Sequence, residues 1–297
     1  MIKKIVWIFP VLSGIFWGSV GVFVRYLKAA EMDSFSIVES RVVMAILILA
    51  LWMLLYDKSL FRIRIKDAWI FCAASLFGML GINLAYNEAI NRISLSLAAV
   101  LLSLSPVYVL IMAAILFGEK ITKKKVICVA LAVAGCVLVS GVFEQTAGMK
   151  LDGIGLLLGG LSGFCYALYS IFSRKAMERD YHGFTITFYC LIVIAVVLLP
   201  VADWSAIGAF AAAAPVKHGL FYVVHALITS VMPYILYTVS LQYMETGKAS
   251  ILAAGEPVAA MIFGALFFNE DPTILALVGL AVTLVALTFL SMPEKKE

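Results

Sequence analysis

Long apolar runs alternate with short polar interruptions along almost the whole chain. A run of about 18 or more apolar residues is a candidate membrane span, because about 20 residues rising 1.5 Å each cross the hydrocarbon of a bilayer. The pattern therefore predicts ten transmembrane helices, at approximately 5–25, 35–56, 68–90, 95–117, 124–142, 153–173, 183–201, 219–241, 249–268 and 273–291.

The composition of the chain is that of a membrane protein. Of its 297 residues, 64% are hydrophobic and only 13% are charged, whereas soluble domains are about half apolar and about one quarter charged. The longest clearly polar interruption, residues 57–67, is too short to form a domain. We therefore expect an all-α integral membrane protein without a soluble catalytic module.

Basic residues are distributed unevenly between the two sets of segments that ten spans would connect. Lys and Arg favour the cytoplasmic side of a membrane. With the N-terminus inside, 16 of the 22 Lys and Arg residues fall in inner segments and five in outer ones, while Arg41 lies within a span. We expect a multi-pass protein of a bacterial-type cytoplasmic membrane with both termini cytoplasmic. The net charge of +4 then faces anionic lipid headgroups rather than nucleic acid.

Two stretches of the chain repeat one another. The segment LAAVLLSLSPVYVLIMAAILFGEKIT (97–122) aligns without gaps with KASILAAGEPVAAMIFGALFFNEDPT (248–273), at an offset of 151 and with 9 identical positions of 26. At an offset of 149, SGIFWGSVGVFVR (13–25) matches SGFCYALYSIFSR (162–174). The chain is therefore predicted to contain one five-span unit twice, over residues 1–146 and 147–297.

The number of spans in each unit determines how the copies are oriented. Because five is odd, the second copy enters the membrane in the opposite sense to the first. Inverted repeats related by an axis in the membrane plane build transporters, in which exchange of conformation between the repeats exposes a central site to alternate sides. The predicted fold is ten transmembrane helices, arranged as two inverted five-helix repeats around a central cavity.

Each repeat carries a proline in the middle of an apolar run, Pro106 in the first and Pro257 in the second. A proline removes one helical hydrogen bond and clashes with the carbonyl four residues earlier, which kinks a helix. The freed carbonyls would be those of Leu102 and Ala253, and lipid cannot satisfy them. We expect both kinks to face the bundle interior; a purely structural kink with no ligand nearby is the alternative.

These features resemble the EamA-type transporters of the drug/metabolite transporter superfamily. The resemblance rests on the run SLAAVLLSLSPVYVLIMAAILFGEKIT, on its partner ending EPVAAMIFGALFFNEDPT, and on a Pro followed 13 residues later by Glu in both halves. It covers essentially the whole chain. The resemblance implies a ten-helix bundle with a cavity between the halves and peripheral fifth and tenth helices. It also implies transport of small organic metabolites, often export.

Glu256 is the strongest candidate for chemistry inside the membrane. Counted inward from Ala249, it lies about 10 Å deep in the hydrocarbon, where a carboxylate is costly unless it is paired, hydrated or protonated. It could bind an amine-bearing substrate or titrate as the coupling site. Alternatively, it caps backbone donors freed by the bend. The other repeat has Ser105 at this position, so the charge is asymmetric.

A second group of ionisable residues lies in the outer half of the membrane. Glu39 and Arg41 are two residues apart and point to different helix faces, so Arg25 is the expected partner of Glu39. The group is interpreted as an extracellular gate or proton relay, or as a salt-bridge network that holds helices together. Its members are Glu39, Arg41, Glu88 and His225.

A third group is aromatic and amide-bearing. Asn and Tyr side chains at membrane depth usually face protein rather than lipid, and aromatic rings can bind cations through their faces. The residues occupy matching positions in the two repeats and are expected to bind substrate or, alternatively, to join helices. They are Trp17, Asn83, Tyr86, Asn87, Tyr166, Tyr234 and Tyr237. Glu119 and Glu270, at span ends, are expected to be solvated boundary residues.

The sequence favours a secondary transporter of small organic solutes, with amino acids or amine-type solutes as the expected substrates and export as the expected direction. A channel or a lipid scramblase on the same repeat is the alternative. No catalytic residue, metal site or cofactor is expected, since no HExxH, Asp-rich or Walker-type motif occurs. The expected partners are the solute, protons and the lipid bilayer, and the expected state is a monomer or a weak homo-oligomer.

Overall fold

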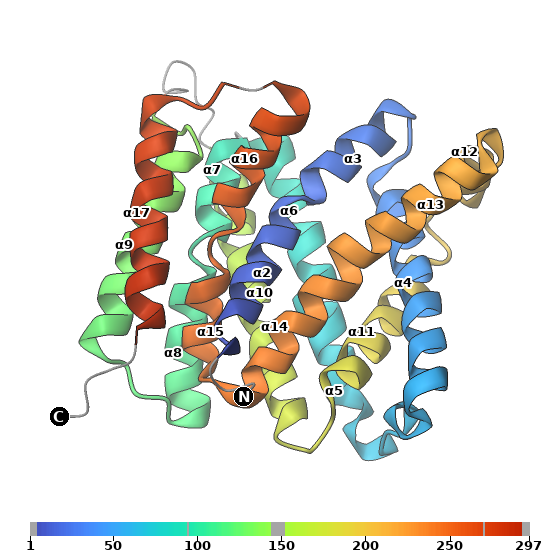
Figure 1. Cartoon of the computed structure of the whole chain (residues 1–297), viewed down its shortest axis with the longest axis horizontal. Coiled ribbons are helices and arrows are strands. Elements are labelled where there is room, and N and C mark those ends of the chain that lie inside the picture. Colours follow the sequence, from blue (N-terminus) through green and yellow to red (C-terminus); the bar gives the residue numbers. More distant parts are fainter. Residues whose placement is uncertain (1–4, 94, 144–151, 270, 293–297) are drawn as a thin grey trace.

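The computed structural model describes residues 5–93, 95–143, 152–269 and 271–292, which form helices and no β-strand (Figure 1). The predicted boundary between the two units, at residues 146 and 147, lies outside this described part. The helices of the first half are α2 (Ile8–Gly18), α3 (Val20–Ala29), α4 (Ser34–Tyr56), α5 (Ala68–Ala73), α6 (Gly81–Arg92), α7 (Leu95–Leu102), α8 (Ser105–Phe117) and α9 (Lys123–Val139).

The second half contains α10 (Gly153–Met177), α11 (Gly183–Leu198), α12 (Trp204–Ala213), α13 (Pro215–Ala226), α14 (Met232–Tyr243), α15 (Thr246–Ala253), α16 (Glu256–Phe268) and α17 (Ile274–Ser291). Two short 3₁₀ turns, η1 (Lys58–Phe61) and η2 (Ile65–Asp67), follow α4. Two π-helical segments, η3 (Ala74–Leu80) and η4 (Leu227–Val231), join α5 to α6 and α13 to α14.

Within the described residues, eight helical segments are long and apolar enough to cross a membrane. They are Ile8–Ala29, Ser34–Tyr56, Ile65–Arg92, Ala98–Phe117, Gly153–Met177, Pro215–Tyr243, Thr246–Phe268 and Ile274–Ser291. The fifth and seventh predicted spans correspond to α9 and α11, which have 17 and 16 residues. The chain is thus an all-helical membrane protein, and the count of ten spans stays a prediction.

Short polar side chains fix where many of these helices begin. Such a side chain accepts hydrogen bonds from backbone N–H groups that have no partner in the first turn of a helix. Thr122 caps α9 and Thr273 caps α17, and the two threonines are equivalent at the offset of 151. Asp203 caps α12, a ten-residue helix that the hydrophobic pattern did not predict because it is too short for a span.

Spans four and nine each contain a short break in the regular α-helix just before the proline. α7 ends at Leu102 and α8 begins at Ser105, while α15 ends at Ala253 and α16 begins at Glu256. Pro106 and Pro257 occupy the first turn of the new helix, where a missing N–H costs nothing. The prolines therefore start the second half of each span, and each short break lies within one helical segment, Ala98–Phe117 or Thr246–Phe268, where the sequence predicts a kink.

The π-helical segments repeat in the same way as the breaks. At the offset of 151, residues 76–80 of η3 correspond to residues 227–231 of η4. A π-helical segment inserts an extra residue into a helix and changes the direction in which all later side chains point. The polar faces of α6 and α14 follow these segments directly. The hydrophobic pattern gave no indication of either segment.

Contacts between the halves establish their relative direction. Gly14 of α2 lies against Ala253, and Gly18 at its end lies against Glu256 and Ala260, so α2 runs parallel to α15 and α16. α10 runs parallel to α7 and α8 in the same way, from Ile93 to Leu102. The backbone at Thr246, where α15 begins, meets the end of α8, so these two spans are antiparallel. Corresponding helices therefore point in opposite directions.

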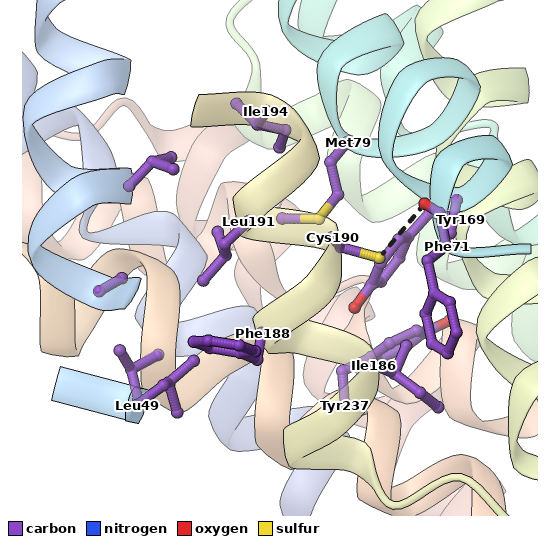
Figure 2. Packing of buried hydrophobic residues seen from close by; sticks show 14 of the residues in the cluster. Leu49, Phe71, Met79, Tyr169, Ile186, Phe188, Cys190, Leu191, Ile194 and Tyr237 are labelled. Atoms are coloured by element: carbon purple, nitrogen blue, oxygen red, sulfur yellow. Dashed lines mark hydrogen bonds between the residues drawn. The ribbon is translucent and has the colours of Figure 1, made fainter. Parts of the chain in front are cut away.

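The largest hydrophobic cluster also joins the two halves, because its buried residues come from both of them. Figure 2 shows Leu191, Ile194 and Phe188 of α11 packed toward Met79 on one side and Leu49 on the other. Within the same region the Cys190 thiol donates to the carbonyl oxygen of Phe71 at 3.8 Å. The pair α9 and α17 packs side by side at one end of the bundle, away from this cluster (Figure 1).

Candidate functional site

A cavity of about 800 Å³ lies between the two repeats. Helices from both halves supply its walls, and it reaches the face of the bundle where α3 and α16 end and α17 begins, since Lys28, Phe268 and Thr273 line it there. Among the residues singled out in the sequence, its lining contains Trp17, Arg41, Asn83, Tyr86, Asn87, Pro106, Tyr166, Tyr234, Glu256 and Pro257. A volume of this size suits a small organic ligand.

The two helix breaks form part of the cavity wall, and a glycine on another helix approaches each break closely. A Cβ atom built on Gly14 of α2 would stand 2.5 Å from the carbonyl oxygen of Ala253. A Cβ built on Gly163 of α10 would stand 3.0 Å from the carbonyl oxygen of Leu101. Gly14 and Gly163 are equivalent at the offset of 149, so both breaks are covered by the same arrangement.

An aromatic cluster forms the floor of the cavity. The ring of Trp17 lies 5.8 Å from that of Tyr166, 5.3 Å from that of Tyr234 and 5.5 Å from that of Tyr237, between ring centroids. Edge and tilted contacts of this kind add to the stabilisation from burial alone. Trp17 is only 8% exposed, and its indole Nε1 has no hydrogen-bond partner among the described residues.

Tyr237 supports this cluster from behind instead of lining the cavity. Its side chain is fully buried, and its hydroxyl is hydrogen-bonded to that of Ser170 at 2.8 Å. Tyr169 and Thr238 form an equivalent buried pair at 2.9 Å. Pairs of this kind join α10 to α14 and fix the rings that face the cavity. Sequence spacing alone could not separate Tyr234 from Tyr237, because both lie on one helix face.

Asn83 contributes to the cavity and to the helix that carries it. Its side-chain Nδ2 donates to the carbonyl oxygen of Met79 at 2.7 Å. That carbonyl belongs to the π-helical segment η3, so the amide stabilises the irregular backbone while its side chain remains at the cavity wall. Asn87 lies one turn further along α6 and also lines the cavity.

Glu256 is the acidic group deep in the cavity. It is the first residue of α16, where the positive end of the helix dipole favours a carboxylate. The carboxylate interacts electrostatically with the hydroxyls of Tyr86, Tyr166 and Tyr234. No ion pair or hydrogen bond joins it to another side chain in the described part of the chain. Its counterpart in the other repeat, Ser105, lines the same cavity.

Arg41 is a buried basic group that lines the same cavity as Glu256, whereas Arg25 and Lys28 line it as exposed residues. Arg41 is 8% exposed, lines the cavity from α4, and its Nε has no hydrogen-bond partner among the described residues. Tyr234 interacts electrostatically with both Arg41 and Glu256. The cavity therefore presents a cation and an anion near one tyrosine, and neither is neutralised by a salt bridge within the described residues.

Of the other ionisable residues of the outer half, Glu39, Glu88 and His225 do not line the cavity, whereas Arg25 does. Glu39 is fully buried, and neither of its carboxylate oxygens has a hydrogen-bond partner among the described residues, so the expected Arg25–Glu39 pairing is not formed. Arg25 lies over the ring of Phe268 at 4.5 Å. His225 is buried and stacks on Phe23 at 5.0 Å. Glu88 pairs with Arg92 at 2.7 Å on an exposed surface.

Away from the cavity, Glu119 joins the two repeats, a role that the sequence-based interpretation missed. Its carboxylate accepts hydrogen bonds from the backbone N–H groups of Thr246 at 2.6 Å and Gly247 at 3.0 Å. Glu119 thus caps α15 from the other repeat and is not a solvated boundary residue. The sequence feature that could have indicated this role is the glutamate at the equivalent position of the second repeat, Glu270. Glu270 itself lies outside the described residues.

A second contact between the repeats lies beside the Glu119 cap. Lys125, which is almost fully buried, forms a salt bridge with Glu245 at 2.5 Å and donates to the carbonyl oxygen of Lys120 at 2.8 Å. Gly118 allows the chain to turn from α8 toward this contact, because its φ of 66° lies in the left-handed region. None of these residues lines the cavity.

Among the described residues, no group of three or more His, Cys, Asp or Glu side chains is arranged to hold a metal ion. The fold and the cavity define a multi-pass membrane protein with two structurally related halves and a solute-sized central cavity. The model of the EamA-like transporter family matches residues 3–141 and again residues 153–292. The chain belongs to the EamA-like transporter family, as the sequence resemblance indicated.

Individual relatives agree with this assignment. An uncharacterized transporter of Archaeoglobus fulgidus is 28% identical over 200 residues, which cover 67% of this chain and 68% of the relative. The threonine/homoserine exporter RhtA of Escherichia coli K12 is 25% identical over 228 residues, or 77% of this chain and 72% of RhtA. A solved crystal structure shares the fold, with a TM-score of 0.78 at 14% identity over 96% of this chain and 95% of the other.

Proposed function

We propose that this chain is a secondary transporter that exports amino acids or amine-type solutes across a bacterial-type cytoplasmic membrane by alternating access. Ten spans then form two inverted repeats, with α9 and α11 as the fifth and seventh, and both termini lie in the cytoplasm. The proposal is carried by one observation: the cavity between the repeats is lined by Glu256 and reaches the face of the bundle where α3 and α16 end.

The geometry supports alternating access in a specific way. With both termini cytoplasmic, the cavity opens to the outside and the Glu119 cap closes the cytoplasmic side. Exchange of conformation between the repeats would release this cap and expose the cavity to the cytoplasm. The resemblance to RhtA, whose name is threonine/homoserine exporter, supports an amino acid as the solute.

Glu256 and the aromatic residues form the proposed substrate site. A carboxylate at membrane depth can attract an ammonium group, and the rings of Trp17, Tyr86 and Tyr166 offer faces to cations and to apolar side chains. Protons are the proposed coupling ions. Glu39 and His225, which are buried outside the cavity, are the candidate coupling groups, while Glu88 is proposed to remain a surface residue at the outer mouth.

Counterflow in proteoliposomes tests the proposal. Vesicles are loaded with unlabelled threonine, and the uptake of trace radiolabelled threonine or phenylalanine is followed against protein-free vesicles. A carrier gives a transient overshoot and saturates with concentration. A channel gives neither, and a lipid scramblase gives loss of outer-leaflet asymmetry of a dye-labelled lipid without solute uptake. Absence of counterflow for all amino acids and amines would contradict the proposed function.

A further inference from the structure

Two buried donors that line the cavity lack acceptors. The indole Nε1 of Trp17 and the guanidinium Nε of Arg41 have no hydrogen-bond partner among the described residues. Each of the two residues is only 8% exposed. Buried polar groups in folded proteins are almost always paired. Two unpaired donors that line one cavity therefore indicate that a bound ligand supplies the hydrogen-bond acceptor for both.

Tyr234 lies near both donors and near Glu256, the acidic group of the cavity. Its ring lies 5.3 Å from that of Trp17 between centroids, and its hydroxyl interacts electrostatically with Arg41 and with Glu256. Arg41 comes from the first repeat, and Tyr234 and Glu256 come from the second. The donors and the carboxylate are therefore arranged around one side chain at the interface between the repeats.

The charges around this tyrosine select the kind of ligand that fits. In the described part of the chain, no salt bridge joins Arg41 to an acidic side chain, and Arg41 interacts electrostatically with Tyr234 and His225. Glu256 has no cationic partner there either. A buried charge is stable only when it is paired, and a ligand with one negative and one positive end would pair both.

We propose that Arg41 and Trp17 form a subsite for the carboxylate of a zwitterionic solute whose ammonium group lies at Glu256. The inference rests on the proposed function and narrows its substrate class from amines in general to α-amino acids. Arginine is suited to this role because its planar guanidinium can donate two parallel hydrogen bonds to a carboxylate. The aromatic rings beside it accommodate the side chain of the solute.

The proposal is tested by competition against counterflow of radiolabelled threonine and phenylalanine. The competitors are the two amino acids, their amides, which lack the carboxylate charge, and their N-acetyl derivatives, which lack the ammonium charge. For the wild-type protein, each amino acid is expected to inhibit counterflow at a concentration at least tenfold lower than its amide. A site that hydrogen-bonds a substrate group rejects analogues lacking that group, because its own polar atoms are then left unpaired.

Variants assign this preference to particular residues. Arg41→Gln is expected to weaken competition by the amino acid at least tenfold, to the level of its amide, and to leave competition by the amide within twofold. Trp17→Phe retains an aromatic ring and removes the N–H together with the five-membered ring that carries it; a two- to fivefold loss confined to the amino acid is expected, and competition by the amide controls for the smaller ring. Arg41→Lys is expected to recover part of the loss, because it restores the charge without the planar donor pair.

The outcomes separate this inference from the proposed function. Equal competition by amino acid and amide in the wild type overturns the carboxylate subsite, while counterflow itself would still support transport. An unchanged preference in a folded Arg41→Gln or Trp17→Phe protein overturns the assignment to these residues. If Arg41→Gln does not fold, the wild-type preference and the Trp17→Phe arm decide the question. Counterflow with no competitor effective at all contradicts the proposed function instead.

Discussion

The Cα atom of Gly14 lies so close to Ala253 that an added Cβ would stand 2.5 Å from the Ala253 carbonyl oxygen. This carbonyl ends α15, where the span is interrupted, so the glycine packs α2 directly onto an irregular backbone. The equivalent contact, between Gly163 and Leu101, covers the break in the first repeat. Gly14 and Gly163 thus allow protein backbone, rather than lipid, to cover the two breaks.

Gly14→Ala is expected to lower the thermal stability of the purified protein. The added methyl group cannot be accommodated without moving α2 away from α15, and overpacking of this kind costs about 1–3 kcal/mol. Gly21→Ala is the matched control, because no atom lies within 4 Å of a Cβ at Gly21, and alanine is the better helix former by about 1 kcal/mol. Equal melting temperatures for the two variants would contradict the close packing of α2 on the break.

Glu256→Gln is expected to reduce threonine counterflow at least tenfold while leaving folding intact. The substitution keeps the size of the side chain and removes the charge that pairs with the ammonium group, and a hydrogen bond to a charged group is worth about 1.5–3 kcal/mol. Glu88→Gln serves as the control, since Glu88 is exposed and pairs with Arg92 at the end of α6. Transport by the two variants at the same rate would contradict a substrate role for Glu256.

Glu119→Ala is expected to loosen the first turn of α15. The carboxylate accepts two backbone hydrogen bonds across the boundary between the repeats, and loss of a helix cap costs about 1 kcal/mol. Hydrogen exchange at the amides of Thr246 and Gly247 should therefore accelerate about fivefold. Glu245→Gln removes the neighbouring charge and leaves these two bonds, so its exchange there should change little. Unchanged protection in Glu119→Ala would refute the cap.

Much of this architecture could be predicted because membrane spans are long and the chain is duplicated. The apolar runs indicated the helices, and the equivalence of Pro106 and Pro257 indicated that spans four and nine are irregular at the same depth. The pattern could not show how many residues leave the regular helix before each proline, because a proline at the first turn of a helix and a proline within one give the same hydrophobic sequence.

Other features were not predictable from residue spacing. The π-helical segment η3 packs against α10, and η4 packs against α4; no residue pattern marks either segment. Tyr237 lies behind the cavity wall, where its hydroxyl is hydrogen-bonded to that of Ser170 on α10. The role of Glu119 depends on a backbone more than 120 residues away in sequence. Each of these features involves contacts between residues far apart in the sequence, which a linear pattern does not record.

Accessibility of an introduced cysteine tests the central claim most directly. Ala260 lines the cavity, and Cys72 is the exposed native cysteine among five, so Cys72→Ser with Ala260→Cys provides a background in which the remaining native thiols are buried. A membrane-impermeant maleimide applied to each side of oriented vesicles should label Ala260→Cys from the outer side, and saturating threonine should slow the labelling. Labelling from the cytoplasmic side alone, or labelling that no solute affects, would contradict an outward-open substrate cavity between inverted repeats.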